Sequence, residues 1–433
     1  MTETEKPMTR KNELHKPSED EYLSCIRCGL CLSKCPTYRE YLTETSSPRG
    51  RVALARKGLE GDLKLTPNLY EQMYACFDCM ACNDICPVGI RPADLVLEMR
   101  YLQEQTNPKK WKGPLFSGLL SNPGRMEWAT FPLRLYQMLG VRRLMYALGL
   151  RWLMPGKLRD MEAMLPHLPQ RPLRSVLPEI TEGKGRHTKK VGFFLGCAQS
   201  LLFADESAAT VRVLARNGCT VMTPRETQCC GMPAMGYGRQ ETVLAMARHN
   251  IDVFEKAKVE TIITDCATCG STLKEYGTLL SDDPQWAERA RTFSSKVRDI
   301  SEFLMEIPII KPEGTINARI TYHDPCHLRR GQKVWQEPRE LIKMINGVDF
   351  IEMKEADWCC GSAGSQLITH YGTSLKVLNR KMDNVEGTGA EIIASGCPGC
   401  QMQLNVGVRK RRSKIKVVHP VLLLDEAYSK KGK

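Results

Sequence analysis

Residues 25–36 read CIRCGLCLSKCP, and residues 76–87 repeat the same pattern as CFDCMACNDICP. Both segments follow the spacing C-x2-C-x2-C-x3-C-P, which is the ligand pattern of proteins that hold two cubane [4Fe-4S] clusters. In this pattern the first three cysteines of a string bind one cluster, and the fourth cysteine binds the other. The spacing therefore predicts two crossed ligand sets, which are Cys25, Cys28, Cys31 and Cys86 for cluster one and Cys76, Cys79, Cys82 and Cys35 for cluster two.

The C-terminal half carries a second, different duplication of cysteines. Its first copy has the spacing C-x31-CC-x35-C-x2-C and consists of Cys197, Cys229, Cys230, Cys266 and Cys269. Its second copy has the spacing C-x32-CC-x36-C-x2-C and consists of Cys326, Cys359, Cys360, Cys397 and Cys400. Of the 19 cysteines, only Cys219 lies outside these arrays, and we interpret it as a buried apolar thiol.

Two other uses of so many cysteines are disfavoured. A zinc site needs only four ligands, whereas the N-terminal strings supply eight cysteines in a crossed pattern. A disulfide framework is typical of short secreted chains, but this chain has 433 residues and its charged first 20 residues contain no apolar signal segment. Since thiolates that bind iron are assembled in a reducing compartment, we expect a cytoplasmic protein.

The periodicity of the chain changes between its two halves. Between the N-terminal strings the pattern is helical, around residues 51–56. In the C-terminal half, strands alternate with helices, which predicts parallel α/β units. The expected strands cover residues 190–195, 219–223, 261–264, 320–322 and 392–394. Ligands of such sheets bind beyond the C-terminal strand ends, where the cysteines fall in both copies, so we expect two duplicated lobes that face each other.

The predicted fold is therefore multidomain. It has an N-terminal, mainly α-helical two-cluster ferredoxin domain, a helical linker, and two duplicated α/β cysteine-rich domains with parallel sheets. The expected boundaries are a flexible tail at 1–20, the ferredoxin domain at 21–110, the linker at 111–186, and the cysteine-rich domains at 187–310 and 311–433.

The linker has an unusual composition. From Trp128 through Arg159 there is no acidic residue, and apolar residues recur at helical spacing among several arginines. Such a basic amphipathic stretch is typical of helices that lie on an anionic membrane surface. It is also typical of a helix pair that packs on its own domain or on a partner subunit. Both interpretations stay open, and the first would place the protein peripherally on the inner face of the cell membrane.

Several function classes are excluded by what the sequence lacks. The formal net charge of +13 is spread along the chain, and no nucleic-acid-binding module is visible. No run of 18 uncharged apolar residues is present to form a membrane span. A strand-linked G-x-G-x-x-G, a P-loop and a hydrolase triad are also missing, so we expect the chain itself to bind no flavin or nicotinamide.

The C-terminal arrays resemble the cysteine-rich CCG domain, which occurs in the disulfide-cleaving component of heterodisulfide reductase and in many electron-transfer proteins. The glycines that follow each cysteine pair, Gly231 and Gly361, belong to this resemblance. It implies that the five cysteines of each copy bind a noncubane four-iron cluster, while ordinary cubane clusters bound by four of the five remain open. His323 and His327 flank Cys326, and we interpret them either as groups that tune a cluster by hydrogen bonding or as structural histidines.

Residues 21–433 as a whole resemble the iron–sulfur subunit of glycolate oxidase and related 2-hydroxy-acid (lactate or glycolate) dehydrogenases. The resemblance is carried by Cys25-Ile-Arg-Cys28-Gly-Leu-Cys31, Cys35-Pro-Thr-Tyr38, Ser47-Pro-Arg-Gly-Arg51 and Cys359-Cys-Gly-Ser-Ala-Gly364. It implies an oxidoreductase made of different subunits, in which FAD on a partner oxidises the hydroxy acid. This chain would then pass the electrons to a quinone or another acceptor.

One departure from that family widens the range of functions. Many of its members have lost part of the final C-x-x-C, whereas Cys397-Pro-Gly-Cys400 is complete here. The complete motif is similar to a heterodisulfide reductase component that combines ferredoxin and CCG modules in the same order. An iron–sulfur component of anaerobic glycerol-3-phosphate dehydrogenase also has this order of modules. These resemblances imply two alternatives: a catalytic subunit that reduces a disulfide at noncubane clusters, and an iron–sulfur subunit that anchors a dehydrogenase to the membrane.

Overall fold

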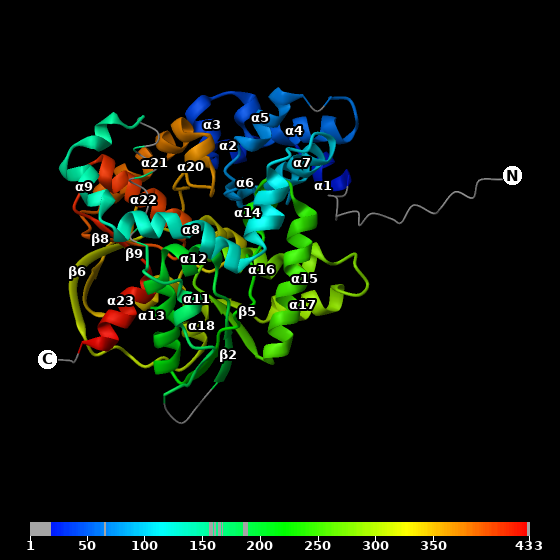
Figure 1. Ribbon diagram of the computed structural model, residues 1–433. Helices are drawn as coiled ribbons and strands as arrows, with labels where there is room; N and C mark the ends of the chain where they lie inside the picture. Colours follow the sequence, from blue (N-terminus) through cyan, green and yellow to red (C-terminus); the bar gives the residue numbers. More distant parts are fainter. Residues whose placement is uncertain are drawn as a thin grey trace.

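The computed structural model describes residues 19–430, except residues 65, 156–158, 160, 161, 163–165, 167 and 185–188. It contains a helical N-terminal unit, a projecting pair of helices and two α/β units side by side (Figure 1). Of the tail predicted at residues 1–20, residues 1–18 lie outside the described part of the chain. The mainly helical N-terminus and the duplicated α/β arrangement confirm the predicted fold class.

The ferredoxin unit, residues 19–106, is built from short helices with proline or a hydroxyl residue at their starts. Pro36 opens the helix after Cys35, and the Ser47 hydroxyl caps α4 by accepting a hydrogen bond from the Gly50 amide at 2.9 Å. Val52, Met73 and Met99 form its buried core. Its elements are α1 (Glu19–Leu23), α2 (Leu30–Lys34), α3 (Pro36–Tyr41), η1 (Glu44–Ser46), α4 (Pro48–Leu59), α5 (Pro67–Tyr74), α6 (Ala81–Ile85) and α7 (Pro92–Thr106).

The first CCG unit, residues 180–306, contains a five-stranded sheet with the order β1-β3-β2-β4-β5. Its strands are β1 (Ile180–Thr181), β2 (Lys189–Phe193), β3 (Cys219–Met222), β4 (Thr261–Thr264) and β5 (Val297–Asp299). Its helices are α12 (Cys197–Leu202), α13 (Ala204–Arg216), α14 (Met232–Gly236), α15 (Gln240–Ala257), α16 (Ala267–Leu279), α17 (Ala287–Ser295) and α18 (Ile300–Glu306). All pairs are parallel except β1 with β3, and β1 lies within the range assigned to the linker although it belongs to this sheet.

The second CCG unit, residues 315–429, contains a four-stranded parallel sheet with the order β7-β6-β8-β9. Its strands are β6 (Thr315–Tyr322), β7 (Asn346–Phe350), β8 (Ile392–Ala394) and β9 (Lys416–Val418). Its helices are η4 (His327–Gly331), α19 (Glu337–Lys343), α20 (Gln366–Thr369), α21 (Tyr371–Glu386), α22 (Pro398–Lys410) and α23 (Pro420–Ser429). The strands expected in both repeats are confirmed, with β6 longer than expected at its start.

The two CCG units share one hydrophobic core. Buried residues of both sheets belong to it, among them Phe193 and Tyr322, and α23 of the second unit packs on α13 of the first. Arg212 on α13 pairs with Asp425 on α23 at 2.6 Å. At the cysteine-bearing ends the Ala267 amide donates a hydrogen bond to the Gly396 carbonyl at 3.0 Å. The repeats therefore face each other, and their cysteine-bearing ends meet.

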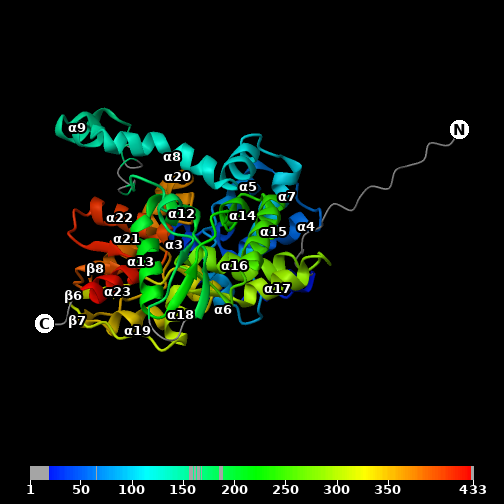
Figure 2. The same ribbon diagram turned by 60° about the horizontal axis from the view of Figure 1, so that its bottom comes forward.

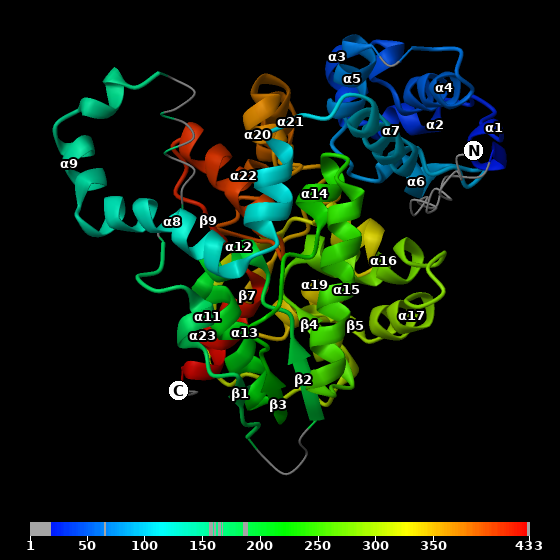
Figure 3. The ribbon, with the colours of Figure 1, turned by 45° about the vertical axis from the view of Figure 1, so that its right-hand side comes forward.

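The arm, residues 123–153, projects from the body of the molecule (Figures 2 and 3). It comprises α8 (Pro123–Met138), α9 (Val141–Ala147) and η3 (Leu150–Leu153), and it is preceded by η2 (Pro114–Leu120) and followed by α11 (Leu173–Val176). Its apolar side chains are largely exposed: Trp128 retains 79%, Trp152 71% and Leu153 82% of their accessible surface. Among the described residues, no helix has the length and apolar character needed to cross a bilayer.

Candidate metal centres

The first ferredoxin string and the last cysteine of the second string line one cavity. Cys25, Cys28, Cys31 and Cys86 surround it, and Ile90 and Val52 close its apolar side. α2 begins one residue before Cys31, and α6 ends one residue before Cys86, so helix ends position two of the four sulfurs. The structure thus brings together the four cysteines that the spacing predicts for cluster one.

The second ferredoxin string lines a separate cavity together with Cys35. Cys35, Cys76, Cys79 and Cys82 border this space, and Phe77 and Val96 supply apolar walls. Burial raises the pKa of the Cys76 thiol, and the Asp78 amide, which donates a hydrogen bond to the Cys76 sulfur at 3.4 Å, partly opposes this rise. The crossed arrangement predicted for cluster two is therefore also the arrangement of side chains in space.

The two strings share an unusual backbone conformation. The third residue of each string, Arg27 or Asp78, and the fifth, Gly29 or Met80, all have positive φ angles, between 47° and 86°. For residues other than glycine this left-handed conformation costs about 1 kcal/mol or more. Its repetition at matching positions shows that both loops have the same backbone course at these residues.

The second CCG site lies where β6 and β8 end. The Cys360 and Cys400 sulfurs are 3.4 Å apart, and the Gly361 amide donates a hydrogen bond to the Cys359 sulfur at 3.3 Å. Gly361 has a φ of +86°, and a Cβ there would lie 2.6 Å from the Ser374 carbonyl oxygen, so only glycine fits this position. All five cysteines of the second copy converge here: Cys326, Cys359, Cys360, Cys397 and Cys400.

The first CCG site has the same construction at the ends of β2 and β4. The Cys197 and Cys229 sulfurs are 3.7 Å apart, and the Cys269 amide donates a hydrogen bond to the Cys266 sulfur at 3.4 Å. The Cys229 and Cys269 thiols adjoin Cys230 and lower its pKa, so the five cysteines form one group. Cys219 is outside this group: it is buried in β3, which confirms its interpretation as an apolar thiol.

The ferredoxin unit and the second CCG unit meet through their cysteines. The Cys79 and Cys359 thiols lie next to each other, and they pack in one apolar cluster with Phe77 and Val377. The Cys359 thiol lowers the pKa of Cys79 to about 7. The guanidinium of Arg330 donates a hydrogen bond to the Cys79 carbonyl at 3.3 Å and pairs with Asp357 at 2.9 Å, which fixes the two units together.

The two CCG sites also approach each other. Thr268, two residues after Cys266, places its hydroxyl 3.5 Å from the Cys397 sulfur. The four groups of cysteines consequently form a spatial series: cluster one, cluster two, the second CCG site and the first CCG site. This order differs from their order along the chain, because the second repeat is the one that contacts Cys79.

The chemistry of the buried thiols fits iron–sulfur clusters, the group that their spacing implies. Burial, followed by neighbouring thiols, raises the pKa of Cys82 and of Cys326 well above the usual range, because several thiolates confined together repel one another. A bound cation relieves this repulsion, and iron takes thiolate ligands in clusters of this kind. None of the 19 cysteines forms a disulfide. The donors present are therefore suited to the implied clusters.

Two cavities adjoin these groups of cysteines. One, of about 240 Å³, opens beside Cys79 and Cys359 and is lined by the cations Lys34, Arg39, Arg330 and Arg380 and the anions Glu355 and Asp357. The other, of about 210 Å³, lies between α7, α14 and α16 and is lined by Tyr101, Met232, Glu275 and His327 among others. Burial, followed by the charge of Asp94, raises the pKa of Glu275 to about 7.

The structure adds two arginines that the cysteine spacing could not predict. Arg330 supports Cys79 as described above. Arg100 on α7 donates hydrogen bonds to the carbonyls of Met73 at 2.9 Å, Cys76 at 2.8 Å and Gly236 at 3.1 Å. Both arginines donate hydrogen bonds to main-chain carbonyls that are distant in sequence, so no local sequence motif identifies them as functional residues.

Comparison with known proteins gives matches along nearly the whole chain. Residues 21–90 match a model described as a 4Fe-4S dicluster domain, and residues 191–274 and 320–405 match a model described as a cysteine-rich domain. Residues 108–165 match a model described as the linker region of the glycolate oxidase iron–sulfur subunit.

Full-length relatives agree with these models. The chain is 36% identical to a probable glycolate oxidase iron–sulfur subunit of Bacillus subtilis, with 98% of each protein covered. It is 32% identical to the glycolate oxidase iron–sulfur subunit of Escherichia coli, over 95% of this chain and 97% of the relative. It is also 28% identical, over 94% of this chain and 72% of the relative, to one of the subunits of a fumarate reductase (CoM/CoB) of Methanothermobacter marburgensis.

Proposed function

The chain belongs to the family of glycolate oxidase iron–sulfur subunits, and on that premise we propose that it carries electrons away from a partner flavin that oxidises a 2-hydroxy acid such as glycolate or lactate. The acceptor in this proposal is a quinone or another small carrier. The main support is the spatial series of cysteine groups, in which the Cys79–Cys359 contact joins the ferredoxin unit to the CCG units. Clusters of the implied kind, when bound, take up and release single electrons.

The chain's own residues would serve this function by holding and separating the centres. The crossed cysteine sets hold two clusters in the ferredoxin unit, and the five-cysteine groups hold one centre in each CCG unit. Apolar residues such as Phe77 and Val377 exclude water where the units meet. The cationic cleft beside Cys79 and Cys359 favours the approach of an acidic partner surface to that point.

The proposal predicts that substrate reduces the centres in the intact complex. The native complex would be purified without oxygen, glycolate or lactate would be added, and the broad visible absorption of the iron–sulfur clusters would be followed. Rapid bleaching is the expected result. If the clusters stay oxidised with both substrates but are still reduced by dithionite, the donor is not a 2-hydroxy-acid flavoprotein, and the proposal fails.

A second candidate function is the reduction of a small disulfide at the CCG sites. It is favoured by the 210 Å³ cavity between α7, α14 and α16, because His327 lines this cavity and its Nδ1 lies 3.3 Å from the Cys326 sulfur. This arrangement offers a place for a small molecule beside a CCG site. Dithionite-reduced protein that reoxidises on addition of a disulfide, but not of a quinone, would move this function to first place.

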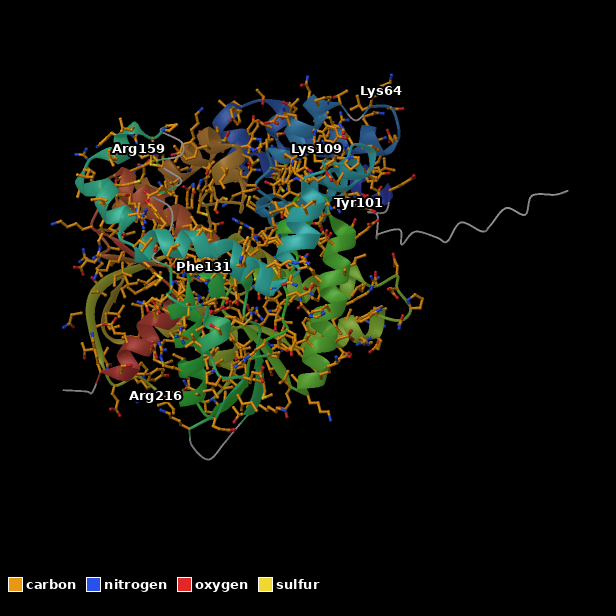
Figure 4. All side chains as sticks on the ribbon, in the orientation of Figure 1. Lys64, Tyr101, Lys109, Phe131, Arg159 and Arg216 are labelled. Atoms are coloured by element: carbon orange, nitrogen blue, oxygen red, sulfur yellow. The ribbon has the colours of Figure 1, made fainter. Side chains whose placement is uncertain are left out.

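For the arm we propose contact with an anionic membrane surface. Helix α8 exposes the apolar side chains of Trp128, Phe131 and Met138, of which Figure 4 labels Phe131. The same arm exposes Arg125 and Arg143. Apolar side chains flanked by arginines, with no acidic residue between Trp128 and Arg159, match the chemistry of anionic lipid headgroups over an acyl layer. A partner subunit is the alternative occupant of this surface.

This contact predicts that the complex floats with vesicles that contain an anionic phospholipid, and that it floats less in high salt. The double variant Trp128→Ser and Trp152→Ser should reduce vesicle binding at least about tenfold, since burying one large apolar side chain contributes about 1.5–3 kcal/mol. Ile310→Ser is the matched control, because Ile310 is 49% exposed outside the arm. Equal flotation of the double variant and the control, or no flotation of the unmodified complex, would refute lipid contact.

A further inference from the structure

His323 is a buried histidine whose ring makes no hydrogen bond of good geometry with the protein. The residue follows the last residue of β6 and retains only 1% of its accessible surface. Its backbone amide donates a hydrogen bond to the Ala394 carbonyl at 3.0 Å. Within the described residues, the ring interacts with the Cys360 thiol, but neither ring nitrogen makes a hydrogen bond of good geometry. Leaving a buried polar group unsatisfied costs about 1–3 kcal/mol, so the ring requires an explanation.

The unpartnered ring lies at the second CCG site. One ring nitrogen of His323, the Cys360 sulfur and the Cys400 sulfur all lie within 4.8 Å of one another, and all three residues are buried. Imidazole nitrogen and thiolate sulfur are both ligands of iron. A single metal ion placed among these atoms would satisfy the orphaned nitrogen.

Another buried histidine shows what a purely structural role looks like in this protein. Both ring nitrogens of His419 are satisfied: Nε2 lies 3.0 Å from the Asp265 carbonyl, and Nδ1 accepts a hydrogen bond from the Val421 amide at 3.1 Å. His323 is buried to the same 1% exposure without such bonds. A structural role therefore accounts for His419 but not for His323.

The first CCG unit has a phenylalanine where the second has His323. The Phe194 amide donates to the Ile263 carbonyl at 2.8 Å, just as the His323 amide donates to Ala394. Ile263 and Ala394 each stand three residues before the first cysteine of the final C-x2-C, so Phe194 and His323 occupy the same place in the two repeats. Phe194 is fully buried and stacks on Phe254, with ring centroids 6.1 Å apart. The histidine is thus specific to the second site.

We propose that a ring nitrogen of His323 binds iron at the second CCG site together with Cys360 and Cys400, whereas the first CCG site is held by cysteines alone. The inference rests on the proposed function, because it assumes that both CCG sites hold iron–sulfur centres. Here the imidazole takes the place of one of the five thiolates, and because it is neutral it brings one negative charge fewer. Histidine in place of cysteine raises the reduction potential of an iron–sulfur centre. The second site, which contacts Cys79, is therefore the more easily reduced of the two.

The test is pulsed EPR spectroscopy of the reduced complex labelled with ¹⁵N-histidine, combined with iron analysis and redox titration. The expected result is a nitrogen hyperfine coupling large enough for a direct iron–nitrogen bond. This coupling should disappear in His323→Cys, which offers a thiolate and should retain the iron with a lowered potential. It should persist in the matched control His327→Gln, which changes the histidine beside Cys326.

One variant in each repeat tests whether the nitrogen ligand belongs to the second CCG site. His323→Phe introduces the residue of the first repeat and should abolish the coupling, while Phe194→His should add a second coupling and raise the potential of the first site. If the unmodified protein binds iron at both CCG sites but shows no strong coupling, or if the coupling survives in both His323 variants, the inference is overturned. If the CCG sites of the unmodified protein hold no iron, the proposed function fails as well.

Discussion

Replacement of Cys79 by serine is expected to leave the partner flavin reducible by substrate, but to lower the rate of electron delivery to the acceptor at least about 100-fold. The magnitude follows because substitution of residues that only support metal ligands already lowers activity by about 10–100-fold. The Cys79 side chain lies where two sites meet, the cavity of cluster two and the second CCG site. It borders the cavity of cluster two, and its thiol contacts Cys359 of the second CCG site. The substitution therefore removes a ligand at the point where the ferredoxin unit meets the CCG units.

The measurement compares two rates in the same anaerobic preparation: bleaching of the flavin by substrate, and reduction of an artificial quinone. Cys219→Ala is the matched control, because Cys219 is also buried but lies in β3, outside every group of cysteines. The control should keep both rates. If quinone reduction in the Cys79→Ser protein equals that of the control, electrons do not pass this point, and the series of sites is wrong.

Local patterns in the sequence were sufficient for most of the architecture. Cysteine spacing predicted the two ferredoxin groups, because the loops between those ligands are short and the cluster they imply has a fixed size. The two CCG groups were predicted from the duplication of a longer spacing and from its resemblance to the CCG domain. The alternation of strands and helices predicted β2, β4 and β8, which are interior strands of the two sheets and whose C-terminal residues are buried. The edge strand β1 was missed, since two residues that pair antiparallel with β3 leave no periodic signal.

Local sequence patterns could not predict how the ferredoxin unit and the two CCG units pack against one another. That Cys79 meets Cys359, and that Arg330 supports the contact, depends on how separate cores dock, which no local period records. The role of His323 was left open between two interpretations, because its sequence neighbours do not reveal whether its ring nitrogens have partners. The exposure of Trp128 was likewise undetermined, since an amphipathic helix has the same pattern whether its apolar face is covered or not.

Docking of the ferredoxin unit onto the first CCG unit depends on one glycine, and Gly238→Ala should disrupt it. Gly238 has a φ of +72°, and a Cβ there would lie 2.3 Å from the carbonyl oxygen of Arg100 on α7. Two neighbouring carbonyls also take part in the contact: Gly236 accepts a hydrogen bond from Arg100 at 3.1 Å, and Tyr237 accepts one from Lys112 at 3.2 Å. The methyl group would push this turn away from α7 and break those bonds.

The expected destabilisation is about 2–5 kcal/mol, which combines about 1–2 kcal/mol for the left-handed backbone with about 1–3 kcal/mol for overpacking. Gly140→Ala separates the two contributions, because Gly140 has a φ of +70° but nothing within 4 Å of the added Cβ. The control should lose only the backbone contribution, about 1–2 kcal/mol. Denaturant midpoints and quinone-reduction rates measured on both anaerobic proteins provide the comparison. Because the control carries the same backbone strain, equal losses would show that the contact between α7 and the turn at Gly238 does not hold the two units together.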